Sequence, residues 1–233
     1  MSFLFLYIAL ALALLDWVAV ARNWKRIRLL VKPGVIIALL VWMWQAAGFS
    51  GHLAWFAIGL LFSMAGDIFL VLPHERFIPA LVSFLLAHLA YLIGFTSGFP
   101  PLNLASPFLA LLVAITAGQV YRRIAASLEA SKQVKLKKPV LVYCAMISLM
   151  LLSALFTLVR QENPQTLAQE AWLPGPALLA SAGAMLFFLS DTFLAWNRFV
   201  DPLPFGKLRV IVTYHLGQAL IVLGAAYHFL SLT

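Results

Sequence analysis

The chain has 233 residues, of which 64% are hydrophobic and only 10% are charged, and its mean hydropathy is +0.98. A soluble domain carries about 25% charged residues, so this composition excludes a soluble protein and predicts an integral membrane protein. The net charge of +8 does not indicate a nucleic-acid-binding protein, because the basic residues lie in short loops between apolar segments. In such loops they set membrane topology.

Eight apolar segments are long enough to cross a membrane, which takes about 20 residues. The first is not expected to be a cleaved signal peptide, because it lacks a basic start, contains Asp16 and runs directly into a basic loop. Pro33, Pro139 and Pro174 fall at predicted span starts, where proline is tolerated. The predicted spans lie near 3–21, 33–49, 52–72, 77–97, 103–121, 139–159, 174–196 and 208–231. The sequence therefore predicts an all-α bundle of eight transmembrane helices that forms one domain over residues 1–233.

The charges of the loops give the predicted orientation. With the N-terminus outside, all but one of the 16 basic residues fall in inner loops, and Arg160 is the exception. The inner set includes Lys32, Arg76 and Arg198. Because cytoplasmic loops are enriched in Lys and Arg, we expect both termini outside. The protein is then a multi-pass protein of the cell membrane, and a site near the inner ends of the spans faces the cytoplasm.

Two segments of the chain resemble each other. Residues 67–70 and 191–194 both read Asp-x-Phe-Leu, and each segment is followed by an Arg-Phe pair, at Arg76 and at Arg198. Both spans run from outside to inside, so the two halves suggest a parallel four-plus-four repeat. Chance similarity in a chain rich in Leu and Phe is the alternative.

Asp67 and Asp191 are the polar residues that most need an explanation. Each lies about five residues from the inner end of its span, which at 1.5 Å per residue is roughly 7–8 Å from the boundary. An ionisable side chain inside a membrane is costly and by default indicates a functional site. Two helices that carry carboxylates at one depth can bring them into one site. Structural ion pairs with Arg76 and Arg198 are the alternative, although these arginines lie about two turns away.

Other polar residues gather at the same level of the predicted bundle. In the fourth span, His88 and Tyr91 share a helix face, as do Tyr214 and Gln218 in the eighth. Hydrogen bonds between helices are the alternative explanation for such residues. Asp16 is expected to pair with Arg22 or another nearby basic residue. The candidate substrate-binding residues are His88, Tyr91, Asn197, Tyr214, Gln218, Arg76 and Arg198.

A face of small residues precedes the first candidate aspartate. Gly59, Ser63 and Gly66 fall on the same helix face as Asp67. Such a face either packs closely on a neighbouring helix or borders a cavity.

Four blocks in order resemble the lysoplasmalogenase (YhhN-type) family. They are Gly66-Asp67 with Leu70, His88-x-x-Tyr91, Ser190-Asp191-x-x-Leu194-Ala195-x-Asn197-x-Phe199 and Thr213-Tyr214-x-x-x-Gln218. The resemblance implies a membrane hydrolase that cleaves the vinyl ether bond of lysoplasmalogens. Its products are a fatty aldehyde and glycerophosphoethanolamine or glycerophosphocholine, and its expected partners are the lysophospholipid and membrane lipid. The aspartates that match Asp67 and Asp191 look like the catalytic pair of that family. At position 215 this chain has His, where relatives often have Tyr.

The chemistry of a vinyl ether fits two carboxyl groups. Protonation of its β-carbon gives an oxocarbenium ion, water adds to the α-carbon, and the hemiacetal collapses to aldehyde and alcohol. One carboxyl group then acts as general acid and the other as base and electrostatic stabiliser, as in glycoside hydrolysis. The sequence does not assign Asp67 and Asp191 to these roles. Arg76 and Arg198 would hold the phosphate, or else serve only as topology-setting charges.

Two other classes of function are compatible with the same residues. A proton-coupled transporter would also use buried Asp and His residues, although no span is interrupted by paired Gly and Pro. A non-catalytic lipid-binding or scaffold protein is the third reading. His88 with Asp67 and Asp191 is not a recognised metal-ligand set, and the single Cys144 provides none. We therefore expect no metal and no cofactor, and neither nucleic acid nor an obligate protein partner.

Overall fold

The computed structural model describes residues 2–72, 74, 76–96, 103–159 and 171–230. All regular secondary structure in these residues is helical. The α helices are α1 (Leu4–Ala21), α2 (Lys25–Ala47), α3 (Leu53–Val71), α4 (Phe77–Phe95), α5 (Ala105–Ala130), α6 (Lys137–Val159), α7 (Pro174–Phe199) and α8 (Gly206–Leu230), and the short 3-10 helix η1 (Val134–Leu136) precedes α6. Within the described residues, eight helices are long and apolar enough to cross a membrane. The predicted all-α bundle of eight spans is thus confirmed.

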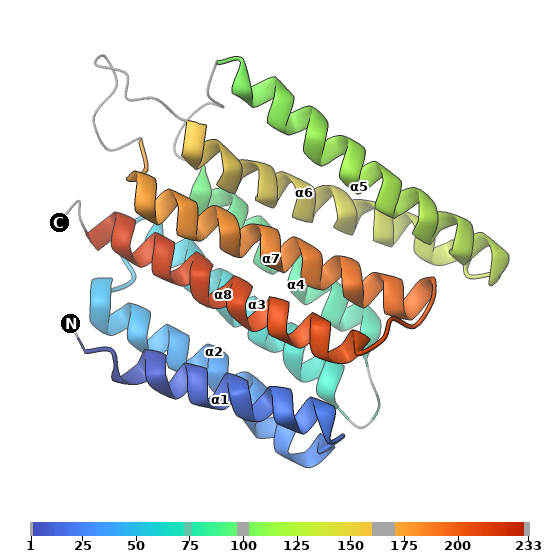
Figure 1. The fold of residues 1–233 in the computed structure, drawn as a ribbon, viewed down its shortest axis with the longest axis horizontal. Helices are drawn as coiled ribbons and strands as arrows, with labels where there is room; N and C mark the ends of the chain where they lie inside the picture. Colours follow the sequence, from blue (N-terminus) through green and yellow to red (C-terminus); the bar gives the residue numbers. More distant parts are fainter. Residues whose placement is uncertain (1, 73, 75, 97–102, 160–170, 231–233) are drawn as a thin grey trace.

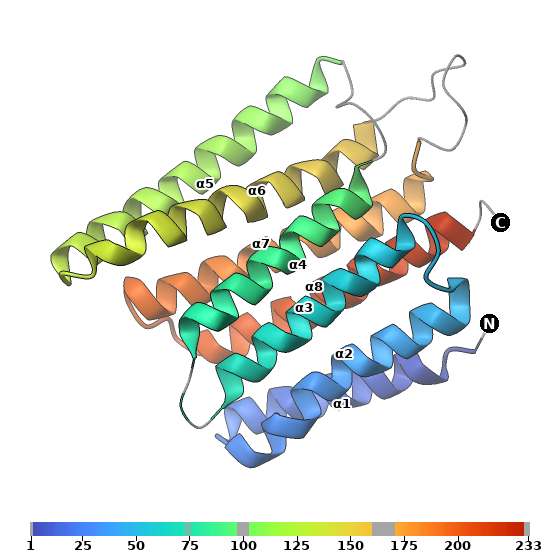
Figure 2. The same ribbon diagram turned by 180° about the vertical axis from the view of Figure 1, so that it is seen from behind.

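The helices pack side by side in pairs. Figure 1 shows α7 and α8 in front of α3 and α4, with α1 and α2 along one side and α5 and α6 along the other. Figure 2 shows the same order from behind. The most extensive contacts join α7 to α8, α3 to α4 and α1 to α2. The odd-numbered helices α1, α3, α5 and α7 all finish at one end of the bundle, here called the basic end because Arg22, Arg76 and Arg198 lie there. The side of the membrane that this end faces and the internal repeat remain predictions.

The start of α2 differs from the prediction. The helix begins at Lys25, so Pro33 lies inside it instead of marking its start. Proline removes one hydrogen bond of the helix ladder, but membrane helices tolerate this where neighbouring groups satisfy the freed backbone. As a result, Lys32 belongs to a packed helix and is only 5% exposed. The fifth span also continues past the predicted residue 121 to Ala130.

The small-residue face of α3 packs against α4. A Cβ atom added to Gly66 would lie 2.6 Å from the ring of Phe84, and one added to Gly59 would overlap the ring of Tyr91. Real Cβ atoms do not approach so closely, so only glycine lets these rings lie against the helix backbone. Of the two interpretations of this face, close packing is confirmed for both glycines. The contact holds α4 next to the helix that carries Asp67.

Replacing Gly66 by Ala is expected to destabilise the bundle. The new methyl group would push Phe84, whose ring already packs edge-on against Phe187 and Tyr214. Overpacking of this kind costs about 1–3 kcal/mol of unfolding free energy, measurable by denaturant or thermal unfolding in detergent. The matched control is Gly118→Ala on α5, where an added Cβ meets no atom within 4 Å. Equal stability of the two variants would contradict the packing argument.

Candidate active site

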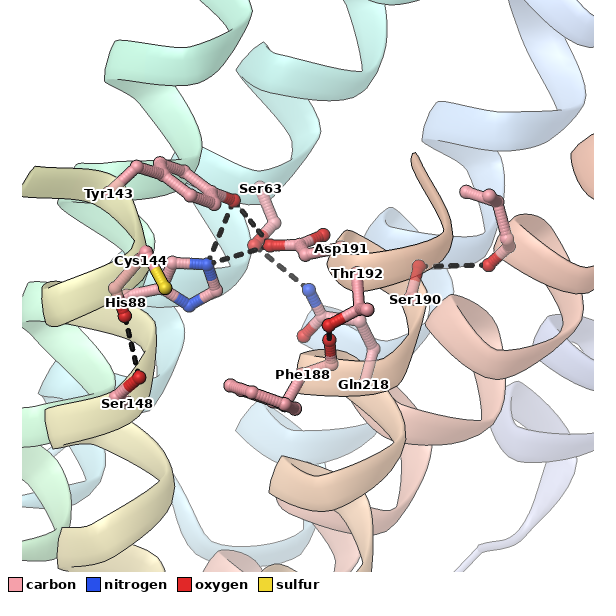
Figure 3. Close-up of polar contacts among 11 residues, drawn as sticks. Ser63, His88, Tyr143, Cys144, Ser148, Phe188, Ser190, Asp191, Thr192 and Gln218 are labelled. Atoms are coloured by element: carbon pink, nitrogen blue, oxygen red, sulfur yellow. Dashed lines mark hydrogen bonds and ion pairs between the residues drawn. The ribbon is translucent and has the colours of Figure 1, made fainter. Parts of the chain in front are cut away.

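Asp191 on α7 meets one residue from α4 and one from α6 (Figure 3). His88 Nε2 lies 3.0 Å from Asp191 Oδ2 and 3.0 Å from the hydroxyl oxygen of Tyr143. The Tyr143 hydroxyl donates to the same carboxylate oxygen. The other oxygen, Oδ1, points away from both partners. Asp191, His88 and Tyr143 are here called the Asp191 cluster. Because both partners bond Oδ2, the Oδ1 atom of Asp191 can contact another molecule.

The Asp191 cluster borders an apolar pocket. The pocket lies between α4, α5, α6 and α7, with Leu70 of α3 contributing to the lining, and its empty space of about 670 Å³ includes volume that is open to the surroundings. Its wall is mostly aliphatic and aromatic, and includes Phe77, Phe84, Ile124, Ile147, Phe188 and Phe199. Asp191 and Tyr143 bring polar atoms to this wall, together with Cys144 and Thr192. A concave site with an apolar wall and few polar groups is typical of sites for small molecules.

An arginine lies at the basic end of this pocket. The guanidinium carbon of Arg198 is 3.9 Å from the centre of the Phe77 ring, and Phe77 packs edge-on against Phe199. Both rings line the pocket. Arg76 immediately precedes α4 and Phe77, and both arginines are exposed. One cation therefore stacks on the aromatic rim of the pocket, and a second immediately precedes the helix that carries Phe77.

Asp67 lies in a second polar cluster. Its Oδ1 atom is 2.7 Å from Lys32 Nζ on α2, and its Oδ2 atom accepts a 2.7 Å hydrogen bond from the hydroxyl of Tyr214 on α8. Asp67 is completely buried. A buried carboxylate is tolerated when it is paired and hydrogen-bonded. Lys32, predicted to be a topology-setting loop charge, is instead the buried counter-ion of Asp67. The alternative pairing of Asp67 with Arg76 is not the one observed.

A further ion pair lies beside this cluster. Asp16 on α1 is 3.1 Å from Arg28 Nε on α2, so Asp16 pairs with a nearby basic residue as expected, although that residue is not Arg22. Trp17 donates through Nε1 to His215 Nδ1 at 3.1 Å. These contacts fasten α1 to α2 and α8. The His side chain at position 215 is therefore used in helix packing.

One aromatic ring contacts both clusters. The ring centre of Phe187 lies 4.7 Å from that of His88 and 5.4 Å from that of Tyr214. In the described part of the chain, Asp67 and Asp191 are not joined directly by a hydrogen bond or an ion pair. The two carboxylates thus belong to neighbouring clusters on either side of Phe187.

Comparison with known proteins places the chain in a family. The model of the YhhN family matches residues 27–225. The chain belongs to the YhhN family. The resemblance based on the four sequence blocks is confirmed. No solved structure matches the chain.

Several relatives of this YhhN-family chain carry a functional name. Lysoplasmalogenase TMEM86B of Homo sapiens is 31% identical over 196 residues, which cover 84% of this chain and 74% of that protein. Lysoplasmalogenase TMEM86B of Mus musculus is 32% identical over 220 residues, 94% of this chain and 83% of that protein. The uncharacterized membrane protein YhhN of Escherichia coli O157:H7 is 29% identical over 225 residues, 91% of this chain and 95% of that protein.

Other candidate residues of the YhhN-family chain lie behind the pocket wall. Tyr91 donates to Gln218 Oε1 at 2.5 Å, and Gln218 Nε2 donates to Ser63 Oγ at 2.9 Å. All three are completely buried, and none is among the residues lining the pocket. Asn197 accepts a 2.8 Å hydrogen bond from the backbone N–H of Leu203. These contacts brace α3, α4 and α8 and shape the α7–α8 connection.

Two residues of the site escaped the sequence-based prediction. The sequence pattern places Lys32 among the basic residues of the inner loops. Tyr143 lies in an apolar segment, where an isolated tyrosine does not indicate a functional site. The acidic residues and histidines offered better signals, because their burial is costly. Among the described residues, no group of three His, Cys, Asp or Glu side chains is arranged to hold a metal ion.

Proposed function

We propose that this YhhN-family protein hydrolyses the vinyl ether bond of lysoplasmalogens. The products are a fatty aldehyde and glycerophosphoethanolamine or glycerophosphocholine. The observation that carries the proposal is the Asp191 cluster in the wall of an apolar pocket. An apolar wall suits a long alkenyl chain, and a carboxyl group with one free oxygen suits proton transfer. The relatives named lysoplasmalogenase support the same reaction.

Asp191 is the carboxyl group that transfers protons in this proposal. Its Oδ2 atom is occupied by Tyr143 and His88, so Oδ1 carries the proton that goes to the β-carbon of the vinyl ether. The resulting oxocarbenium ion is attacked by water at the α-carbon, and Asp191 takes the proton that the water loses. The same group thus acts first as acid and then as base. His88 is fully buried and holds the carboxyl group in place.

Asp67 is the second carboxyl group of the proposed pair and remains ionised. Lys32 and Tyr214 both stabilise the charged form through charge-assisted hydrogen bonds. Tyr214 packs edge-on against Phe84, which lines the pocket, and against Phe187, which contacts His88. Asp67 therefore fixes the wall behind the Asp191 cluster, and in this proposal the part of its charge that Lys32 does not offset stabilises the cation that forms.

The arginines at the rim are proposed to bind the head group. Arg198 stacks on Phe77 at the basic end of the pocket, Arg76 immediately precedes Phe77 in the chain, and guanidinium groups bind phosphate through charge-assisted hydrogen bonds. The lysolipid would then enter between helices from the membrane, with its chain in the pocket and its phosphate at the rim. Because positive loops face the cytoplasm, we place this rim on the cytoplasmic side.

Hydrolysis of lysoplasmenylcholine by purified protein in detergent tests the proposal. In D₂O the released aldehyde is expected to carry one deuterium at C2, because the β-carbon receives its new hydrogen from an exchangeable acid. The control substrate is the saturated alkyl-ether lysolipid, which has no vinyl group to protonate and should release no aldehyde. Aldehyde without deuterium would exclude protonation at the β-carbon. A folded, lipid-supplied protein that releases no aldehyde would exclude the hydrolase and favour the transporter.

A further inference from the structure

We propose that Tyr143 is a further catalytic residue, whose hydroxyl protonates the glycerol oxygen as it leaves. This inference rests on the proposed vinyl ether hydrolysis and concerns its last step. Of the three members of the Asp191 cluster, Asp191 and Tyr143 line the pocket, whereas His88 is completely buried. Tyr143 is therefore placed to touch the substrate beside the carboxyl group that starts the reaction.

The geometry gives the Tyr143 hydroxyl two stabilising neighbours. It donates to Asp191 Oδ2 and lies 3.0 Å from His88 Nε2, and the rings of Tyr143 and His88 meet edge-on with centres 5.3 Å apart. A hydrogen on His88 Nε2 can be shared between the carboxylate oxygen and the tyrosine oxygen. If the hydroxyl loses its proton, His88 can stabilise the phenolate by donating to it. Tyr143 can therefore give up a proton briefly and recover it.

The last step of the reaction needs a donor of this kind. Water addition leaves a hemiacetal, and Asp191 has regained its proton. The bond between the former α-carbon and the glycerol oxygen then breaks as the carbonyl forms. Tyr143 gives its proton to the glycerol oxygen, and its phenolate takes the proton of the hemiacetal hydroxyl. The net change is the movement of one proton between two substrate oxygens, and the step requires no other reactant.

The position of the donor fits the shape of the substrate. The β-carbon and the glycerol oxygen are bonded to opposite sides of the α-carbon, so a single carboxyl oxygen cannot face both equally well. We assign Asp191 Oδ1, which is not the oxygen bonded by Tyr143 and His88, to the carbon side. The hydroxyl of Tyr143, which comes from a different helix and is bonded to the other carboxyl oxygen, serves the oxygen side.

The variant Tyr143→Phe tests this role through the leaving group. With lysoplasmenylcholine, kcat is expected to fall about 10²-fold or more, as for loss of a general acid, while KM changes little. With an alkenyl ether whose leaving alcohol is a phenol, the leaving oxygen needs no proton, so the loss in kcat should shrink to a few-fold. A residue that only positions Asp191 would lower turnover of both substrates by the same factor.

The control is Tyr121→Phe on α5, which removes a hydroxyl bonded to the backbone oxygen of Lys137 and outside the pocket lining. Its turnover of both substrates is expected to match wild type within about two-fold. An equal loss of kcat for both substrates in Tyr143→Phe, or no loss, overturns the inference while leaving the hydrolase standing. A wild-type protein that releases no aldehyde from either substrate overturns the proposed function itself.

A second variant keeps the inference testable if Tyr143→Phe does not fold. Difluorotyrosine at position 143 keeps the ring and the hydroxyl but is a more acidic phenol. The alkaline limb of the kcat–pH profile with lysoplasmenylcholine is expected to move to lower pH, and the profile with the phenol-leaving substrate to stay. The titratable groups that contact Tyr143, Asp191 on α7 and His88 on α4, are unchanged in this variant. Identical profiles for natural and fluorinated protein would contradict the inference.

Discussion

Replacing Asp191 by Asn is expected to lower kcat for lysoplasmenylcholine about 10²- to 10⁴-fold, the range for loss of a general acid–base group. The amide has nearly the same shape and can still accept a hydrogen bond from Tyr143, but it offers no acidic proton to the β-carbon. The fold should therefore persist, and KM should change little. Aldehyde release measured over a range of substrate concentrations separates kcat from KM.

The control for this experiment is Asp201→Asn. Asp201 lies in the connection that follows α7 and is exposed, so its replacement makes the same Asp-to-Asn change without touching the pocket. It is expected to leave turnover unchanged. Full turnover by Asp191→Asn, in protein that unfolds at the wild-type temperature, would show that Asp191 transfers no proton and would remove the basis of the proposed mechanism.

Much of the site was predictable because it contains ionisable groups in apolar segments. Asp67, His88 and Asp191 stand out in the sequence for the cost of burying them in a membrane, and the structure buries all three. The positions of the helices followed from segment length and loop charge. Those two signals depend only on local composition, which explains why they were reliable.

The partners of these residues were not predictable, because they depend on how the helices pack. Tyr143 reaches Asp191 only because α6 lies against both α4 and α7, and no local pattern in α6 indicates this. Lys32 precedes Pro33 and follows several basic residues, so its sequence context is that of a loop. The continuation of α2 through Pro33 turns the side chain of Lys32 into the bundle instead.

Removing either partner of the buried Lys32–Asp67 pair is expected to destabilise the protein strongly. The two charged atoms lie 2.7 Å apart, and their side chains are 7% and 0% exposed. Lys32→Met leaves a carboxylate without its counter-ion, and Asp67→Asn leaves an ammonium group without one. Breaking one side of a buried ion pair costs about 3–5 kcal/mol, whereas replacing both sides with apolar groups is often nearly neutral. The double variant Lys32→Met/Asp67→Leu should therefore be more stable than either single variant.

The unfolding free energies of the two single variants and the double variant are measured by denaturant unfolding in detergent. The ion pair of Lys137 and Glu129 provides the control. That pair lies at the surface, with side chains 28% and 59% exposed, and solvent screens such pairs, so Lys137→Met should cost much less unfolding free energy than Lys32→Met. If Lys32→Met lowered the unfolding free energy as little as Lys137→Met does, the Lys32–Asp67 pair would not be the buried, stabilising contact described here.

Activity of the double variant separates the structural role of Asp67 from its proposed role in catalysis. If Asp67 contributes its charge to the reaction, Lys32→Met/Asp67→Leu should regain stability and yet show little aldehyde release. This outcome requires that the carboxylate act on the neighbouring site across Phe187, whose ring contacts both His88 and Tyr214. Recovery of both stability and turnover would mean that the ion pair only holds α2 against α3. Asp191 would then be the single carboxyl group of the reaction, and the two-aspartate mechanism would be wrong.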